Sequence, residues 1–170
     1  MQSQGQMEWT SEGKDTTMAA QHFLVPIDFS EYANQALEYA IGLASKLSAR
    51  VTLLHVIQPL PLGGVDMSVT PPYTYLQDLE AELTSSMQAY LERVTAAGLE
   101  GEIVVLHGVP FQEILETAKT QQVDLIVMGT HGRTGFQHLL LGSVAEKVVR
   151  LAPCPVLIVR ESRHEVQSGT

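Results

Sequence analysis

The sequence predicts an α/β fold in which helices cover both faces of a five-stranded parallel sheet, a doubly wound arrangement. Short apolar runs of strand length alternate along the chain with longer segments whose apolar residues recur at helical spacing. Helical segments separate the strands throughout, and this alternation is typical of parallel strands joined by right-handed crossovers. With 170 residues and a hydrophobic content of 45%, the chain is large enough for one domain with a buried core.

The first strand is predicted at residues 22–27, and a helix follows it to about residue 47. Ser30 is a suitable N-cap for this helix because its hydroxyl can accept a hydrogen bond from the first turn. The second strand, at residues 50–57, is a nearly continuous apolar run, as expected for a strand that is covered on both faces. Pro26 usually indicates an edge strand. Near a strand end it indicates a break in the ladder, where a ligand can approach.

Residues 58–74 are rich in proline and glycine, and we interpret them as a mobile lid or a simple crossover. An apolar stripe from Leu76 to Val94 predicts the second helix, which Gly98 is expected to end. The remaining predicted elements are a strand at 102–106, a helix with Pro110 at its first position, a strand at 125–128, a helix from Ser143 to about 151, and a strand at 155–159.

The composition limits the partners and the cellular compartment. The formal net charge is −9 and the ten basic residues form no cluster, which argues against nucleic acid as a partner. No apolar run is long enough to span a bilayer and the N-terminus does not resemble a signal peptide, so we expect a cytoplasmic protein. The single cysteine, Cys154, cannot form an internal disulfide and is interpreted as a small buried hydrophobic residue.

Three glycines and a serine follow the fourth predicted strand at a characteristic spacing. Gly129, Gly132 and Gly142-Ser143 fit the pattern G-x2-G-x9-G-[S/T], and the pattern ends where the fourth predicted helix begins. Glycines let the backbone approach an anion closely, and the first turn of a helix offers unpaired N–H groups and the positive end of the helix dipole. A strand, a glycine loop and a helix N-terminus in this order therefore predict a phosphate-binding site.

This spacing resembles the ATP-binding signature of the universal stress protein family, in the branch whose members bind nucleotide. It is neither a Walker P-loop nor the G-x-G-x-x-G dinucleotide motif. The resemblance extends from about Phe23 to Arg160. Other segments that resemble the family are 25–30, 54–56, 108–110 and 153–156. The resemblance implies an adenine nucleotide alpha hydrolase-like (Rossmann-like) fold with strand order 3-2-1-4-5. The domain is expected at 21–161, between flexible tails at 1–20 and 162–170.

In parallel α/β sheets, ligands bind beyond the carboxyl ends of the strands, where the strand order reverses. The family order puts that reversal between the strands that end near Asp28 and Gly129. The resemblance then implies that phosphates are held by His131, Gly132, Arg133, Gly142, Ser143 and Val144. It also implies that Pro26, Val56, Met128 and Gly129 line a slot for adenine. Asp28 would contact the ribose or a phosphate-bound Mg²⁺. The expected ligand is ATP, or the related AMP or ADP.

Each of these residues also has a purely structural interpretation. Ser143 and Glu146 fit a capping box, and Asp28 can simply begin the turn before the first helix. Val56 and Met128 can be core residues, and Arg133 a solvated loop charge. His55, His107 and His131 do not have the spacing of a metal site, so ordinary polar or edge histidines are favoured.

The favoured function is an ATP-binding stress protein that acts as a nucleotide-responsive regulatory module and hydrolyses ATP slowly at most. One alternative is an ATPase or adenylyl-transferring enzyme on the same scaffold, although the motifs His-x-Gly-His and Ser-Gly-Gly-x-Asp-Ser are absent. The other is a nucleotide-free dimerisation module. The resemblance also implies a homodimer formed by antiparallel pairing of strand 156–159, an apolar strand that an edge position would leave unpaired. A further protein partner is expected but not identified.

Overall fold

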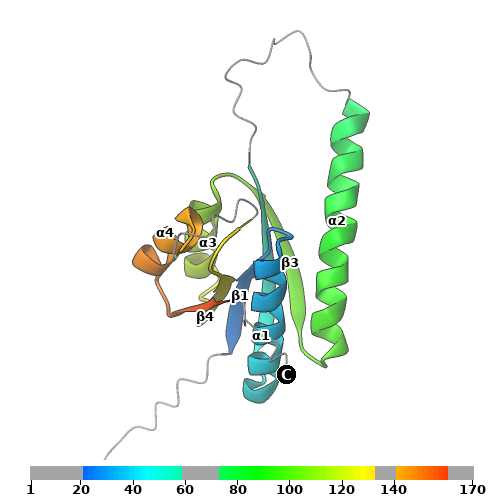
Figure 1. The fold of residues 1–170 in the computed structure, drawn as a ribbon. Helices are drawn as coiled ribbons and strands as arrows, with labels where there is room; N and C mark the ends of the chain where they lie inside the picture. Colours follow the sequence, from blue (N-terminus) through cyan, green and yellow to red (C-terminus); the bar gives the residue numbers. More distant parts are fainter. Residues whose placement is uncertain (1–20, 59–72, 133–140, 161–170) are drawn as a thin grey trace, which may run out of the picture.

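The computed structural model describes residues 21–58, 73–132 and 141–160 (Figure 1). Its nine elements alternate strictly between strand and helix, as the sequence predicts. They are β1 (His22–Pro26), α1 (Glu31–Leu47), β2 (Arg50–Ile57), α2 (Tyr73–Ala96), β3 (Gly101–His107), α3 (Pro110–Thr120), β4 (Leu125–Gly129), α4 (Ser143–Leu151) and β5 (Val156–Val159).

The five strands form one parallel sheet in the order β3-β2-β1-β4-β5, which confirms the expected fold and strand order. Helices α1 and α2 cover one face, and α3 and α4 cover the other (Figure 1). Each face has its own buried cluster. Phe23, Val25 and Leu53 face α1 and α2, whereas Leu24, Leu54 and Ile126 belong to the cluster on the other face. This alternation along β1 and β2 is the period-2 pattern of strands that are buried on both sides.

The ladder between β1 and β4 is short. Only Phe23↔Leu125 and Leu24↔Ile126 are in register, whereas β1 and β2 pair along the whole of β1. Because the N–H of Ile27 donates to Leu54 of β2, the N–H at the neighbouring position would face β4. That position is Pro26, which has no N–H to donate. Pro26 therefore lies in the central strand and not at an edge, and the ladder stops beside it as the sequence analysis predicts.

Local capping agrees with the sequence at two helices and differs at a third. Ser30 caps α1 by accepting a hydrogen bond from the Ala33 N–H at 3.2 Å, and Pro110 begins α3. At α4 the N-cap is Gly142 and not Ser143, so the predicted capping box does not form. The cause is tertiary, because the Gly142 N–H donates to the Thr130 carbonyl at 2.8 Å while the residue is extended.

A polar network lies at the end of the sheet where the strands begin. The Thr52 hydroxyl donates to Oε1 of Glu102 at 2.7 Å, so it accepts from Nε2–H of His22 at 2.8 Å. Nδ1 of this neutral His22 then accepts from Nη2 of Arg50 at 2.9 Å. Burial, and then the Arg50 charge, lower the pKa of His22, which is only 3% exposed. Burial and the Arg50 charge therefore favour the neutral imidazole.

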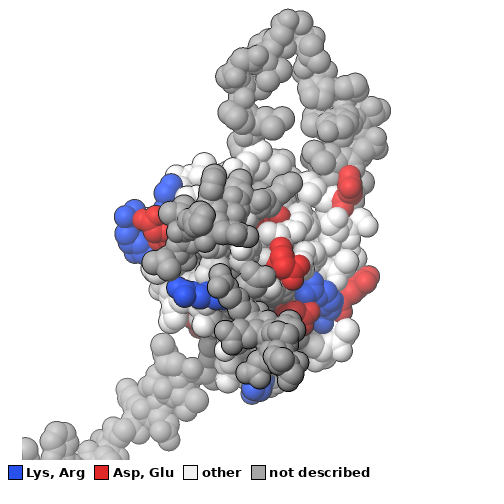
Figure 2. All heavy atoms as spheres, in the orientation of Figure 1, with Lys and Arg blue, Asp and Glu red and all other residues white. Residues whose placement is uncertain are grey.

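Some basic side chains on the described surface lie beside acidic ones, and others lie apart from them (Figure 2). Arg93 bonds Glu38 at 2.6 Å between α2 and α1, and Arg150 lies 4.0 Å from Glu146 on α4. Positive charge is thus dispersed over the face that the figure shows and forms no single patch there. In the described part of the chain, none of the helices has an 18-residue stretch that is apolar enough to cross a bilayer.

Candidate functional site

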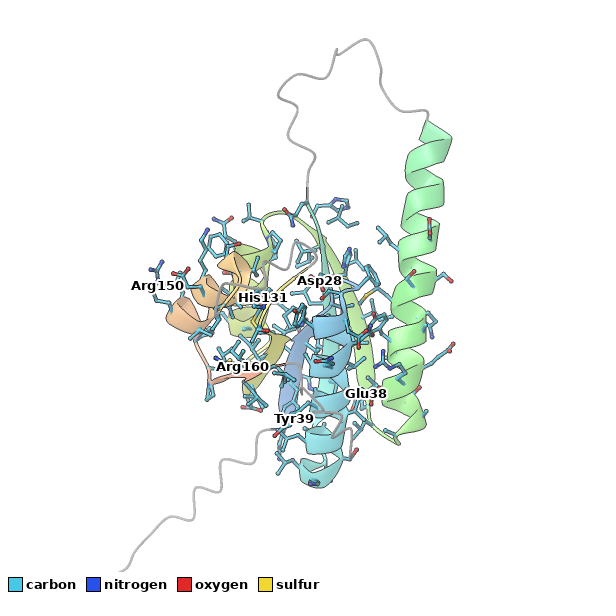
Figure 3. The ribbon with its side chains drawn as sticks, in the orientation of Figure 1. Asp28, Glu38, Tyr39, His131, Arg150 and Arg160 are labelled. Carbon is cyan, nitrogen blue, oxygen red and sulfur yellow. The ribbon has the colours of Figure 1, made fainter. Side chains whose placement is uncertain are left out.

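Asp28 follows β1 and is held in a tight turn. Its Oδ1 accepts hydrogen bonds from both the N–H of Ser30, at 3.0 Å, and the hydroxyl of Ser30, at 2.6 Å. Because Ser30 also caps α1, the carboxylate is fixed relative to the helix as well as to the strand. Figure 3 shows Asp28 and His131 close to one another near the carboxyl ends of β1 and β4. The two sequence segments singled out for binding therefore meet at one place.

The glycine loop packs directly against this turn. A Cβ atom placed on Gly132 would lie 2.7 Å from Oδ2 of Asp28. A Cβ on Gly142 would lie 3.3 Å from the carbonyl oxygen of Thr130 and 3.4 Å from Cα of His131. The bond from Gly142 to Thr130 closes the base of the loop. At both Gly132 and Gly142, therefore, a side chain would crowd neighbouring protein atoms, and only glycine allows this close approach of the backbone.

The N-terminus of α4 borders the same loop. Gly142 is the N-cap, so Ser143 lies in the first turn of the helix. Ser143 is exposed and Val144 is half-buried. The first N–H groups of a helix have no partner within the helix, and the helix dipole makes this end positive. Together with the glycine backbone, this end of α4 can bind an anionic group.

Three of the four residues predicted to line an adenine slot, namely Pro26, Val56 and Met128, share one face of the sheet, whereas Gly129 packs against α1. Val56 and Met128 pack with the cluster that α3 and α4 cover. Pro26 lies on the same face, because it follows Leu24 of that cluster by one strand period. The three residues belong to the adjacent strands β2, β1 and β4, near their carboxyl ends. The structure therefore brings the predicted slot residues together, and Met128 also serves the core.

Gly129 has a packing role that the sequence analysis did not separate from binding. A Cβ on Gly129 would lie 2.7 Å from Cβ and 2.8 Å from the carbonyl oxygen of Tyr32 in α1. Close packing of α1 on β4 therefore requires a glycine at this position. The Tyr32 ring also contacts the His131 ring, with centroids 5.4 Å apart, and Nδ1 of His131 lies 3.1 Å from the Thr130 hydroxyl. These contacts fix the start of the glycine loop.

Sequence reasoning missed three residues of this region, namely Phe29, Tyr32 and Thr130. Phe29 has a left-handed backbone (φ 64°), which no sequence pattern indicates for a phenylalanine. Tyr32 and Thr130 meet the glycines largely through backbone atoms, which carry no residue-specific signal. Arg133 lies outside the described residues, as does most of the segment interpreted as a lid.

Within the described ranges, no three side chains of His, Cys, Asp or Glu form a group that can hold a metal ion. His55 has a different role, because its Nδ1–H donates to the Ile27 carbonyl at 2.7 Å. Asp28 offers one carboxylate at the site. A divalent ion there would have to take most of its ligands from a bound molecule and from water.

A five-stranded parallel sheet in this order, covered by helices on both faces, defines the adenine nucleotide alpha hydrolase-like class of α/β folds. The universal stress protein family profile matches residues 19–160. The chain belongs to the universal stress protein family.

Related proteins resemble this chain both in sequence and in structure. Universal stress protein MJ0531 of Methanocaldococcus jannaschii is 34% identical over 143 residues, which cover 84% of this chain and 83% of that protein. The solved structure of the MJ0577 protein, from the same organism, superposes with a TM-score of 0.74 at 30% identity, over 85% of this chain and 99% of that one. A universal stress protein in complex with cAMP superposes with a TM-score of 0.63 at 25% identity, over 83% and 97% of the two chains.

Proposed function

We propose that this protein binds ATP, or the related AMP or ADP, and acts as a nucleotide-responsive regulatory module. One observation supports this above the others: Asp28, Gly132 and Gly142 meet where the strand order reverses between β1 and β4. Ligands of parallel α/β sheets bind at this position. The short ladder beside Pro26 separates the two strands there.

The chemistry of the site suits a nucleotide. Pro26, Val56 and Met128 offer apolar atoms to a base on one face of the sheet. The Gly142 N–H is already bonded to Thr130. The backbone at Gly132 and the first N–H groups of α4 offer donors to phosphates, and Arg133 would add charge. The Asp28 carboxylate accepts hydrogen bonds from ribose hydroxyls, or binds Mg²⁺ that the phosphates carry. The related structure in complex with cAMP supports an adenine nucleotide as the ligand.

The described site favours binding over catalysis. Phosphoryl transfer requires a positioned nucleophile and charge neutralisation at the leaving group. The Asp28 carboxylate is already engaged by two bonds from Ser30, which suits a ligand contact better than a general base. We therefore propose slow hydrolysis at most, in a cytoplasmic protein whose output passes to a protein partner.

We also propose a homodimer that pairs through β5. This strand occupies the sheet edge, is purely apolar and is half-buried along its length. Its second edge is unpaired within the described sheet, so a second copy can extend it.

Isothermal titration of the full-length chain with ATP, ADP and AMP, with and without Mg²⁺, tests the binding proposal. The Gly142→Asp and Ser143→Asp variants place a carboxylate at the phosphate position, and we expect each to weaken affinity by about tenfold or more, equivalent to about 1.4 kcal/mol. Gly42→Asp is the matched control. Gly42 is exposed on α1 and a Cβ there meets nothing within 4 Å, so this variant should bind like the wild type.

Equal affinity in the wild type and both loop variants would overturn the assigned site. Absence of binding by the wild type would instead favour the nucleotide-free dimerisation module. Turnover of ATP well above that of Ser143→Asp would favour the enzyme alternative.

A further inference from the structure

Phe29, the residue between Asp28 and Ser30, adopts a backbone conformation that residues other than glycine rarely adopt. Its φ is 64°, in the left-handed region. This single inverted residue turns the chain so that the Ser30 N–H and hydroxyl both reach Oδ1 of Asp28. The other carboxylate oxygen, Oδ2, faces Gly132. The direction of the carboxylate thus depends on the backbone of Phe29.

The Phe29 side chain is held between two rings from other elements. Its centroid lies 4.7 Å from that of His55 in β2, and 5.8 Å from that of Tyr90 in α2, in an edge-on arrangement. His55 is 7% exposed, and its bond to the Ile27 carbonyl ties it to the end of β1. Aromatic pairs at these distances are attractive beyond their buried area.

Tyr90 is itself fixed to α1. The Arg93 guanidinium lies 5.1 Å from the centre of the Tyr90 ring, and it donates to Oδ1 of Asn34 at 3.0 Å and to Glu38 at 2.6 Å. Both acceptors belong to α1, the helix that Ser30 caps. The Phe29 ring is therefore held from β2 and α2, while the turn that it shapes is held from α1.

We propose that Phe29 is a positioning residue of the candidate site, and that His55 and Tyr90 hold its ring so that its inverted backbone aims Asp28 at the glycine loop. It acts through Asp28 and need not touch the ligand. The affinity part of the test rests on the proposed nucleotide function, whereas the part that follows the Ser30 amide does not.

Hydrogen exchange of the Ser30 amide in the nucleotide-free, full-length chain tests the geometry. The variants are Phe29→Ala and Tyr90→Leu. The second leaves the Asp28 turn unaltered in sequence and keeps an apolar side chain in α2. We expect both to speed Ser30 exchange at least about fivefold, the effect of losing roughly 1 kcal/mol of local protection. Leu99→Ala is the control, because Leu99 packs on the same core cluster beside the start of β3. It should leave the Ser30 rate unchanged.

A double-mutant cycle with Asp28→Asn tests whether Phe29 acts through Asp28. Nucleotide affinity is measured by titration for each variant of the cycle. We expect Phe29→Ala to weaken ATP affinity about tenfold in the wild-type background and less than about twofold in the Asp28→Asn background. Equal losses in both backgrounds, or wild-type Ser30 exchange in Tyr90→Leu, would overturn the proposal. A wild-type chain that binds no nucleotide would remove the proposed function, and the exchange experiment would still decide the role of Phe29.

Discussion

Oδ2 of Asp28 lies 2.7 Å from the position that a Cβ of residue 132 would occupy. A carboxylate at the end of the first strand and a glycine in the fourth β–α loop are thereby placed in direct contact. Two sequence motifs that are far apart in the chain are therefore in contact. Whether position 132 requires glycine can be tested by adding one methyl group, that is, by substituting alanine.

Gly132→Ala should weaken nucleotide affinity by about tenfold or more, because the methyl group must displace the Asp28 carboxylate. Gly42→Ala is the matched control in an exposed stretch of α1. The control should retain affinity and gain about 0.5–1 kcal/mol of stability, since alanine is the better helix former. Calorimetric titration and chemical denaturation of both variants measure the two effects. Unchanged affinity in Gly132→Ala would contradict the assigned geometry.

Gly129→Ala should destabilise the fold by about 1–3 kcal/mol, because its Cβ meets backbone atoms of Tyr32 that cannot rotate away. Gly101→Ala provides the comparison. There the nearest atoms are side-chain carbons, Cδ1 of Leu91 at 2.7 Å and Cγ1 of Val94 at 2.9 Å, and no backbone atom is among them, so we expect a smaller loss. Urea denaturation gives both values. An equal or larger loss for Gly101→Ala would show that the α1–β4 contact is looser than described.

Stability should fall as the solution is acidified through the range in which His22 binds a proton. The ordinary pKa of histidine is 6.5, and that of folded His22 is lowered by burial and by Arg50, with the Gln121 carbonyl, Glu102 and Asp124 opposing the shift. Below pH 6.5 the unfolded chain therefore binds more protons at this residue, and the free energy of unfolding decreases until the pH reaches the folded pKa. Urea titrations between about pH 7.5 and 5.5 should show a shallower decline for His22→Gln. Identical slopes would exclude His22 as a contributor.

Ile158→Pro should abolish pairing through β5 while sparing the sheet. Pro155 and Val159 accept bonds from β4, so by alternation the backbone of Leu157 also faces β4 and that of Ile158 faces the open edge. Leu157→Pro would break the sheet itself, which makes it the less selective variant. Light scattering should report a dimer for the wild type and a folded monomer for Ile158→Pro. A dimer that survives this substitution would place the interface elsewhere.

Local signals in the sequence were sufficient to predict the order of strands and helices along the chain. Apolar periodicity, the Ser30 cap and Pro110 at the start of α3 each depend on neighbouring residues, and all three are confirmed. The glycine spacing likewise led to the loop that meets Asp28. The family comparison supplied the strand order, which periodicity does not contain.

The remaining features depend on contacts between distant residues. Serine is a favoured N-cap residue, but the hydrogen bond from Gly142 to Thr130 makes Gly142 the N-cap in place of Ser143. The His22 network is assembled from residues of three strands, and its neutral imidazole depends on the partners that it finds there. Phe29 has a left-handed backbone and its ring contacts rings from β2 and α2, and no local pattern indicates either feature.

The brief ladder between β1 and β4 divides the sheet into two unequal leaves, β3-β2-β1 and β4-β5. Few main-chain bonds join the leaves near the candidate site, while α1 packs across both. A molecule that contacted Asp28 on one leaf and Gly142 on the other would link the two leaves. Binding of that molecule would then restrict motion of the two leaves relative to one another, and the two leaves would unfold together at a higher temperature.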